Sequence, residues 1–135
     1  MNHAMTYIYE VYKEKSFSQA AKNLFISQPA LSTYIKKTEN ELGIQIFDRT
    51  SLPVRPTEAG ELYIQAIQSI IAKSLKEHPN AMCSYSGGSD SDIMIHMIET
   101  VRKIFDLPPV KYFFFETGLE MEATRRHVRE TAKLY

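Results

Sequence analysis

The sequence predicts an α+β protein made of two unlike parts: a helical N-terminal part that ends in one long helix, and a C-terminal part that alternates strands and helices. Apolar residues recur at three- and four-residue intervals through most of the first eighty positions, as on the buried faces of helices. After a break at His78–Pro79–Asn80, the run VKYFFF at positions 110–115 concentrates β-branched and aromatic residues, which favour strands.

Composition and charge narrow the class of protein. The chain of 135 residues is 44% hydrophobic and 24% charged, as in packed globular proteins. Lys and Arg number 16, and so do Asp and Glu, with 9 basic and 8 acidic residues in 1–79 and 7 and 8 in 80–135. A DNA-binding surface would therefore have to arise from local placement of charge. The single Cys83 excludes an internal disulfide and a Cys-based zinc cluster, and we expect an inert buried thiol. No apolar run approaches the length of a membrane span and no signal-peptide pattern occurs, which predicts a cytoplasmic protein without a membrane partner.

Two helices are predicted before residue 25. The first runs from about Ala4 to Lys13, and its apolar face is formed by Met5, Ile8, Tyr9 and Tyr12. The second begins at Ser16, which forms an S-x-x-Q capping-box pattern with Gln19 and so satisfies free amide donors at the helix start. Its buried residues are expected to be Ala20, Ala21 and Leu24.

A third helix follows a three-residue turn at 25–27. Ser27 can cap this helix, and Pro29 is tolerated in its first turn because no hydrogen-bond donor is required there. Gly43 is expected to end it in a left-handed conformation. The residues expected to face inward are Leu31, Ile35 and Leu42.

The next segment, IQIFDRTSLPVRPT, predicts a short strand at 44–47 and a hairpin-like loop punctuated by Pro53 and Pro56. Thr57 then caps a helix over about 58–76. An apolar stripe that long on an isolated helix requires a partner. The stripe is expected to consist of Ala59, Leu62, Tyr63, Ala66, Ile67, Ile70, Ile71 and Leu75.

A small-residue helix, a three-residue turn and a polar second helix together predict a helix-turn-helix. Arg49 and Arg55 bracket the hairpin, as expected of a wing that follows the DNA backbone or the minor groove. Polar side chains that can donate to phosphates and base edges share the outer face of the third helix, with no acid before Glu39. They are Gln28, Ser32, Thr33, Lys36 and Lys37.

The stretch SFSQAAKNLFISQPALSTYIKKTENELGIQIFDRT, followed by VRPTEAG, resembles the DNA-binding domain of LysR-type transcriptional regulators. The resemblance implies a winged helix-turn-helix at 1–57, with the third helix in the major groove of double-stranded DNA and no cofactor required. It also implies that the helix at 58–78 is a linker that pairs two subunits, chiefly through 58–76. The implied DNA-binding residues are Ser18, Ser27, Gln28, Pro29, Ser32, Thr33, Tyr34, Lys36, Lys37, Arg49 and Arg55.

Two residues depart from the family pattern, and each candidate contact has a structural alternative. Tyr34 replaces a usual glutamine and is expected to alter base readout, and Thr38 replaces a usual leucine and is expected to weaken packing. The lysines could form an ordinary solvated helix face. Arg49 could pair with Asp48 or Glu39, and Tyr34 could pack on the wing.

The C-terminal part is predicted to have the order strand, helix, strand, helix. We expect a strand at 81–85, a helix at 92–105, a buried strand in the VKYFFF run and a last helix at 121–135. This order implies a parallel pair of strands joined by a crossover helix, and two strands alone make an incomplete α/β unit.

The loop SGGSDS at 86–91 joins the first strand of this part to its helix. Backbone amides and a helix start favour anions, although glycine–serine loops are also common as plain turns. SYSGGSDSDIMIHMI and VKYFFFETGLEMEATRRHVRE resemble the start of the PP-loop ATP pyrophosphatases, in particular the phosphoadenylyl-sulfate reductase-like branch. The resemblance covers about residues 81–134 of a predicted segment at 80–135, and it implies ATP or adenylyl sulfate as the ligand. The implied nucleotide-binding residues are Ser86, Gly87, Gly88, Ser89, Asp90, Ser91, Thr117 and Gly118.

The sequence leaves three hypotheses for function. The first is a dimeric, sequence-specific DNA-binding transcriptional regulator of LysR type. The second is a truncated PP-loop nucleotide-binding domain that carries an N-terminal helix-turn-helix. Catalysis is not expected, because the reductase cysteine of that family would lie beyond Tyr135. The third is a degenerate gene product without a settled function.

Overall fold

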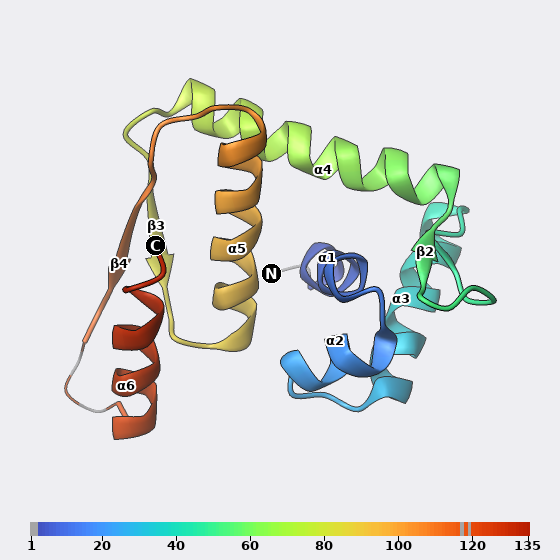
Figure 1. Cartoon of the computed structure of the whole chain (residues 1–135), viewed down its shortest axis with the longest axis horizontal. Coiled ribbons are helices and arrows are strands. Elements are labelled where there is room, and N and C mark those ends of the chain that lie inside the picture. Colours follow the sequence, from blue (N-terminus) through green and yellow to red (C-terminus); the bar gives the residue numbers. More distant parts are fainter. Residues whose placement is uncertain (1–2, 117, 119) are drawn as a thin grey trace. The chain divides into compact units, whose positions relative to one another are not determined.

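The structure is a computed structural model that describes residues 3–116, 118 and 120–135. Its first half contains three short helices, a two-stranded wing and a long helix (Figure 1). Residue contacts divide the chain into two compact units between Ile70 and Ile71, inside the long helix and ahead of the predicted break at 78–80. The elements of this half are α1 (Ala4–Glu14), α2 (Phe17–Asn23), α3 (Gln28–Leu42), β1 (Phe47–Asp48), β2 (Arg55–Pro56) and α4 (Glu58–Glu77).

Local capping begins and ends the helices of the first unit as predicted. The hydroxyl of Ser16 accepts a hydrogen bond from the Gln19 amide at 3.2 Å, and Ser27 accepts one from the Ala30 amide at 3.3 Å. Only half of the capping box forms, because the Gln19 side chain donates to Asn23 instead of returning to Ser16. Gly43 ends α3 with φ +69°.

The core of the first unit lies between α1, α2, α3 and the start of the wing. Two predicted core residues are wrong: Met5 is 40% and Leu42 44% exposed. The buried face of α1 passes through Ala4, Ile8 and Val11 and leaves Met5 outside. The buried face of α3 continues through Thr38 and Glu39, so Leu42, the last residue of α3, lies beyond it. The fully buried apolar side chains include Ile8, Val11, Leu31, Ile35, Ile46 and Phe47.

The long helix α4 carries apolar residues on two faces and not on the single stripe that we predicted. Ile64, absent from the predicted stripe, is buried together with Ile67 and Ala72. Leu62 and Ile70 are 63% and 59% exposed, and Ala66 between them is exposed as well. Because these three residues are spaced by four, they form one solvent-facing stripe. None of the described helices has the length and apolar character needed to cross a membrane.

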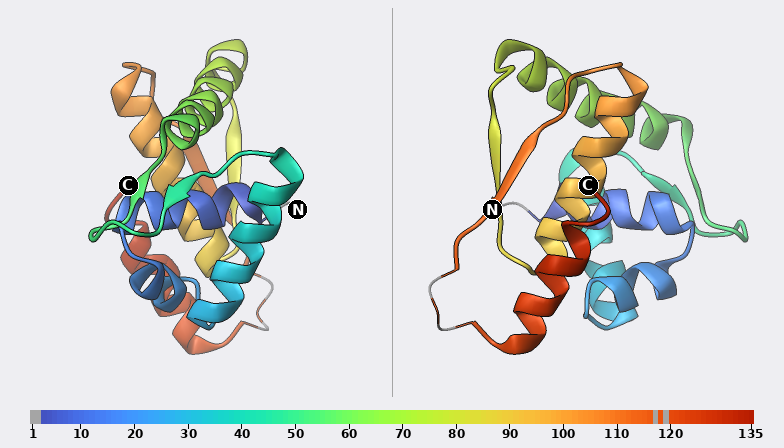
Figure 2. Two further views of the ribbon diagram at one scale, coloured as in Figure 1. Left: turned by 90° about the vertical axis from the view of Figure 1, so that its right-hand side faces the viewer. Right: turned by 60° about the vertical axis from the view of Figure 1, so that its left-hand side comes forward.

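Besides the end of α4 from Ile71 onward, the second unit contains β3 (Met82–Tyr85), α5 (Ser89–Ile104), β4 (Lys111–Phe114) and α6 (Glu122–Thr131). The two strands pair in parallel, with Met82 opposite Lys111 and Tyr85 opposite Phe114, so the predicted parallel pair is confirmed. Figure 2 shows the two strands side by side. Helix α5 begins three residues before the predicted Asp92, because Ser89–Asp90–Ser91 forms its first turn rather than a loop.

The prediction of a buried strand holds for only one face of β4. Tyr112 and Phe114 are partly buried, whereas Phe113 is 37% and Phe115 78% exposed. Tyr112 donates to Glu99 of α5 at 2.9 Å, so the covered face is the one toward that helix. With two strands in the sheet, the other face keeps its aromatic residues in solvent. Cys83 is partly buried on the covered face, where burial raises the pKa of its thiol.

Candidate nucleic-acid interface

The outer face of α3 presents most of the residues predicted to contact DNA. Helical spacing places Pro29, Thr33 and Lys36 on one exposed side. Gln28 is exposed at the first residue of the helix. Lys37 is exposed too, and its ammonium lies 3.8 Å from the Glu41 carboxylate, a surface pair that leaves it accessible. This face therefore offers hydroxyl, amide and ammonium donors from successive turns.

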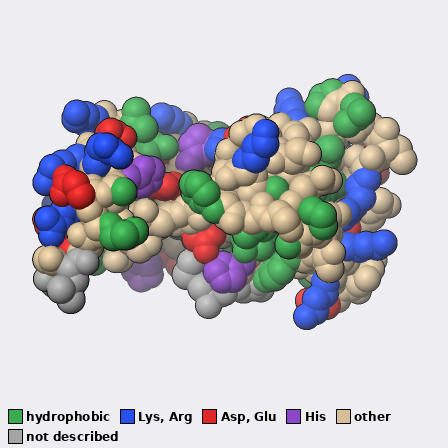
Figure 3. Space-filling view, turned by 90° about the horizontal axis from the view of Figure 1, so that it is seen from below, with side chains coloured by type: hydrophobic (Ala, Val, Ile, Leu, Met, Phe, Trp, Pro, Cys, Tyr) green, Lys and Arg blue, Asp and Glu red, His purple; other side chains and the backbone are tan. Residues whose placement is uncertain are grey.

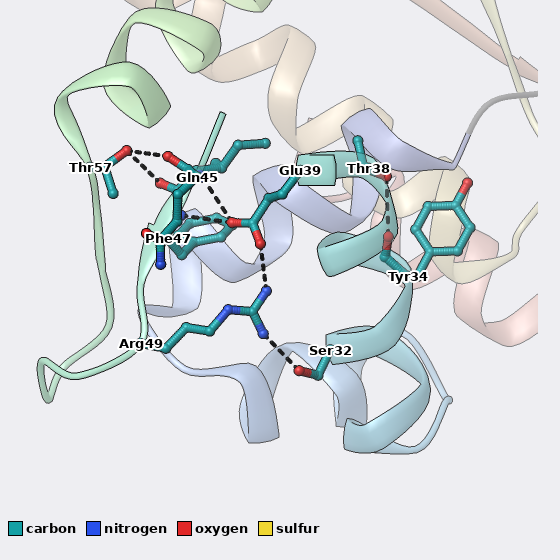
Figure 4. A network of polar contacts seen from close by, with 9 residues as sticks. Ser32, Tyr34, Thr38, Glu39, Gln45, Phe47, Arg49 and Thr57 are labelled. Carbon is teal, nitrogen blue, oxygen red and sulfur yellow. Dashed lines mark hydrogen bonds and ion pairs between the residues drawn. The ribbon is translucent and has the colours of Figure 1, made fainter. Parts of the chain in front are cut away.

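Glu39 ties α3 to the wing. Its carboxylate is buried, and Oε1 accepts hydrogen bonds from the backbone amides of Ile46 at 2.8 Å and Phe47 at 3.1 Å. These amides precede and begin β1, where an isolated two-stranded ladder leaves donors unpaired. A helix side chain thus completes the hydrogen bonding of the strand that leads into the wing (Figure 4).

Arg49 connects Glu39 to Ser32, as Figure 4 shows. Its Nη2 donates to Oε2 of Glu39 at 2.8 Å and its Nη1 donates to Oγ of Ser32 at 2.8 Å. The guanidinium also lies over the ring of Phe17, 4.9 Å from its centre. The alternative pairing of Arg49 with Glu39 is confirmed, whereas Asp48 accepts from the amide and hydroxyl of Thr50 instead.

A groove of about 530 Å³ lies between the start of α2, the start of α3 and the wing. Four of the predicted DNA-binding residues line it: Ser18, Gln28, Ser32 and Arg49. The wing contributes Leu52, which is 92% exposed, and Pro53. The structure therefore brings together side chains that are up to thirty-one positions apart in the sequence, from Ser18 to Arg49.

The remaining predicted residues lie elsewhere on the unit. Arg55 is exposed on β2, and the hydroxyl of Ser27 is used to cap α3. The ring of Tyr34 packs edge-on against Tyr7 of α1, with ring centres 4.9 Å apart, and not on the wing. Thr38 is buried, and its hydroxyl is satisfied by the Tyr34 carbonyl at 3.2 Å, so it leaves no unpaired polar group in the core.

Sequence reasoning underrated Glu39 and did not assign Phe17 or Leu52 to the site. The sequence predicts Glu39 only as one possible partner of Arg49. A detectable signal was its position, because it falls four residues after Ile35 on the inward face of α3, where an acid requires several partners. Phe17 gave no such signal, since an apolar residue at a helix start is ordinary.

The glycine loop of the second unit is closed by its own hydrogen bonds. The Ser86 hydroxyl donates to Ser91 Oγ at 3.0 Å, and the Ser91 hydroxyl also lies 2.7 Å from the Gly88 carbonyl. Gly87 has φ +76°, and an added Cβ would lie 3.0 Å from Thr124 and 3.1 Å from Val128, so packing against α6 requires glycine there. Gly88 has ordinary extended backbone angles, and its nearest contact would be 3.6 Å away.

Other features of the predicted nucleotide site give mixed support. Ser89, Asp90 and Ser91 form the first turn of α5, where Asp90 and Asp92 place two carboxylates at the helix start. Gly118 is exposed with φ +86°, and Thr117 lies outside the described residues. A cavity of about 240 Å³ between α5, β4 and α6 includes Tyr85 but no residue from 86 to 91.

Tyr85 is the last residue of β3 and directly precedes this loop. Its hydroxyl donates to Asp92 and lies 3.3 Å from that of Thr131, and Asp92 also lies 2.7 Å from Nε2 of His127. Burial and the Asp92 carboxylate raise the pKa of Tyr85 to about 12, so the phenol stays protonated at neutral pH.

On the face shown in Figure 3, Lys and Arg side chains lie beside Asp and Glu side chains instead of forming one continuous basic patch.

Comparison with known proteins finds a family profile that matches within the first unit. The sequence profile of the bacterial regulatory helix-turn-helix protein, lysR family, matches residues 3–61. The probable RuBisCO transcriptional regulator of Thalassiosira pseudonana is 37% identical over 127 residues, which covers 90% of this chain and 41% of that protein. The HTH-type transcriptional regulator PgrR of Escherichia coli (strain K12) is 34% identical over 106 residues, which covers 76% of this chain and 34% of that protein.

A solved structure was also found, that of BenM_DBD in complex with benA site 1 DNA. It is 36% identical with a TM-score of 0.49, and the match covers 55% of this chain and 83% of that chain. BenM is an HTH-type transcriptional regulator of Acinetobacter baylyi. The chain spans less than half the length of the two curated regulators described above. Residues 3–61 form a LysR-type helix-turn-helix DNA-binding domain.

Proposed function

We propose that this chain is a sequence-specific DNA-binding transcriptional regulator of LysR type. The observation that carries the proposal is the exposed polar face of α3, flanked by the wing that Glu39 and Arg49 hold in place, within the segment that matches the family profile. The alignment with the Thalassiosira regulator covers 90% of the chain, so the likeness to regulators extends into the second unit.

The chain acts as a homodimer paired through α4. The solvent-facing stripe of Leu62, Ala66 and Ile70 supports this arrangement, because an exposed apolar stripe at four-residue spacing is the surface that a second helix covers. A dimer of this kind reads two half-sites separated by about one helical turn of DNA or a multiple of it.

The test is selection of binding sites from a random DNA pool with the intact chain, in parallel with and without Mg-ATP. Enrichment of a sequence with two half-sites supports a dimeric regulator. Enrichment of single half-sites would contradict the proposal that the chain binds DNA as a dimer. A selected sequence that changes with nucleotide would make the second unit a sensor. The absence of any enriched sequence would refute the proposal.

Replacing Lys36 with alanine is expected to weaken binding to the selected DNA and to flatten its salt dependence. Each lysine that neutralises a phosphate contributes roughly −0.9 to the slope of log affinity against log salt concentration. We expect the slope to lose about that amount, measured by fluorescence anisotropy from low to physiological salt. Lys103, an exposed lysine on α5, is the matched control, and Lys103→Ala is expected to leave the slope unchanged. If both variants show the same slope of log affinity against log salt concentration, Lys36 does not contact DNA.

We propose as a second candidate that the SGGSDS loop binds the phosphates of ATP or adenylyl sulfate, as in a PP-loop domain. The supporting observation is Gly88, which lies at the start of α5, where backbone amides favour anions. The fold itself gives no steric reason for glycine at this position, so close approach of a phosphate would account for it. Against it stand the internal hydrogen bonds of the loop and the two aspartates of the first helical turn.

Substitution of Gly88 by alanine separates these interpretations. Its backbone angles suit any residue and an added Cβ would meet nothing closer than 3.6 Å, so Gly88→Ala should leave the thermal midpoint within a few degrees. If the loop holds a phosphate against its backbone, titration of Mg-ATP by calorimetry should show binding by the parent chain and at least tenfold weaker binding by the variant. A parent chain that binds no nucleotide would leave the loop as a plain turn.

A further inference from the structure

Ser32 uses its hydroxyl differently from Thr38 and Thr100, two other hydroxyl residues inside helices. Thr38 and Thr100 each donate to the carbonyl four residues earlier, at 3.2 Å and 2.8 Å, as hydroxyl side chains inside helices often do. Ser32 instead accepts a hydrogen bond from Arg49, and among the described residues its own hydrogen has no acceptor. A hydroxyl that accepts from one side retains its single hydrogen for another partner.

The direction of the bond between Arg49 and Ser32 is fixed by chemistry. A guanidinium carries only donors and stays protonated, so the serine oxygen must be the acceptor. The guanidinium is held from two further sides, by the buried Glu39 carboxylate and by the Phe17 ring. A charged donor at 2.8 Å also polarises the serine O–H bond and makes it a stronger donor.

We propose that Ser32 is a dedicated hydrogen-bond donor to DNA, and that Arg49 acts on DNA through Ser32 as a positioning residue and not as a cation bound to phosphate. This inference rests on the proposed DNA-binding function. Ser32 lines the groove beside the wing together with Ser18 and Gln28, so its hydroxyl lies at a surface that DNA can reach. Its partner is an acceptor atom of DNA, either a purine N7 on a base edge or a phosphate oxygen.

The charge balance supports the role given to Arg49. Its guanidinium lies 2.8 Å from a Glu39 carboxylate that is itself 8% exposed, so the pair contributes little net charge to the surface. A free cation on the wing would add about one unit to the salt dependence of binding, whereas a neutralised pair adds almost none. Salt dependence therefore distinguishes Arg49 from Lys36.

The first test is a double-mutant cycle with Ser32→Ala and Arg49→Lys on a duplex selected by the parent chain. Lysine keeps the charge but lacks the planar fork that joins Glu39 to Ser32. Loss of one hydrogen bond to a charged or base-edge acceptor is expected to weaken affinity about tenfold for Ser32→Ala. Arg49→Lys should add little once Ser32 is alanine, and the salt slopes should match that of the parent. Additive losses in the cycle would overturn the positioning role of Arg49.

The second test uses modified DNA and needs only Ser32→Ala, so it holds even if Arg49→Lys does not fold. Duplexes carry 7-deazapurines, which lack the N7 acceptor, or neutral methylphosphonates at single positions. One modification should weaken the parent about tenfold and leave Ser32→Ala unaffected, and its type identifies the base edge or the phosphate. Equal affinities of the parent and Ser32→Ala for unmodified DNA would overturn the inference about Ser32 but not the proposed function. A parent chain that selects no DNA would overturn the proposed function with it.

Discussion

Replacing Gly60 with alanine is expected to destabilise the first unit more than replacing its other glycine, Gly43, with alanine. An ideal Cβ at this position would lie 2.0 Å from the carbonyl oxygen of Ile46 and 2.8 Å from its carbonyl carbon. Both atoms belong to the backbone, so no side-chain rotation relieves the contact. The start of α4 would have to move away from the start of β1.

That movement would also break hydrogen bonds that join α4 to the wing. The carbonyl of Ile46 accepts from the amide of Thr57 at 2.9 Å, and the hydroxyl of Thr57 donates to the Gln45 carbonyl while capping the amide of Gly60 at 3.0 Å. Overpacking costs about 1–3 kcal/mol, and each lost hydrogen bond adds roughly 1 kcal/mol. We expect Gly60→Ala to lower the free energy of unfolding by about 3 kcal/mol or more, measured by urea denaturation followed by far-ultraviolet circular dichroism.

Gly43→Ala is the control, because glycine at this position is favoured by the backbone conformation and not by a close contact. Gly43 has φ +69° and no atom within 4 Å of an added Cβ. Gly43→Ala should therefore cost only the strain of a left-handed alanine, about 1 kcal/mol. If the two variants lose the same free energy, close approach of α4 to β1 is not what Gly60 provides.

The sequence was most informative where structure depends on neighbouring residues. Ser16, Ser27, Gly43 and Thr57 mark helix ends through contacts within about four positions, and all four were placed correctly. The helix-turn-helix followed because its helices are short, capped and joined by a three-residue turn. Its donor-rich outer face followed from helical spacing alone.

Predictions failed where a residue's environment depends on distant parts of the chain. The buried face of α4 passes through Ile64, but Leu62 and Ile70 are equally apolar, so periodicity could not decide which face turns inward. The strand β4 has an apolar run that indicates a buried strand, yet a two-stranded sheet leaves Phe113 exposed. The loop at 86–91 has residues typical of a turn, and half of it is helix, because serine and aspartate also begin helices well.

Replacing Glu39 with alanine is expected to destabilise the first unit by about 3–5 kcal/mol, the usual cost of removing one partner from a buried ion pair. The change removes the acceptor of two backbone amides and the counter-ion of Arg49 at once. Glu39→Gln should cost less, because an amide oxygen can still accept from Ile46 and Phe47 while the charge is lost. Urea denaturation of the full chain measures both variants.

Glu41 is the matched control for this substitution. It lies two residues later on the same helix, its side chain is 64% exposed, and its only described ion pair is with Lys37 at 3.8 Å. Glu41→Ala should change the free energy of unfolding by no more than about 0.5 kcal/mol. A Glu39→Ala variant as stable as Glu41→Ala would mean that the wing does not depend on α3. In that case the rigid placement of Arg49, and with it the orientation given to the Ser32 hydroxyl, would lose its physical basis.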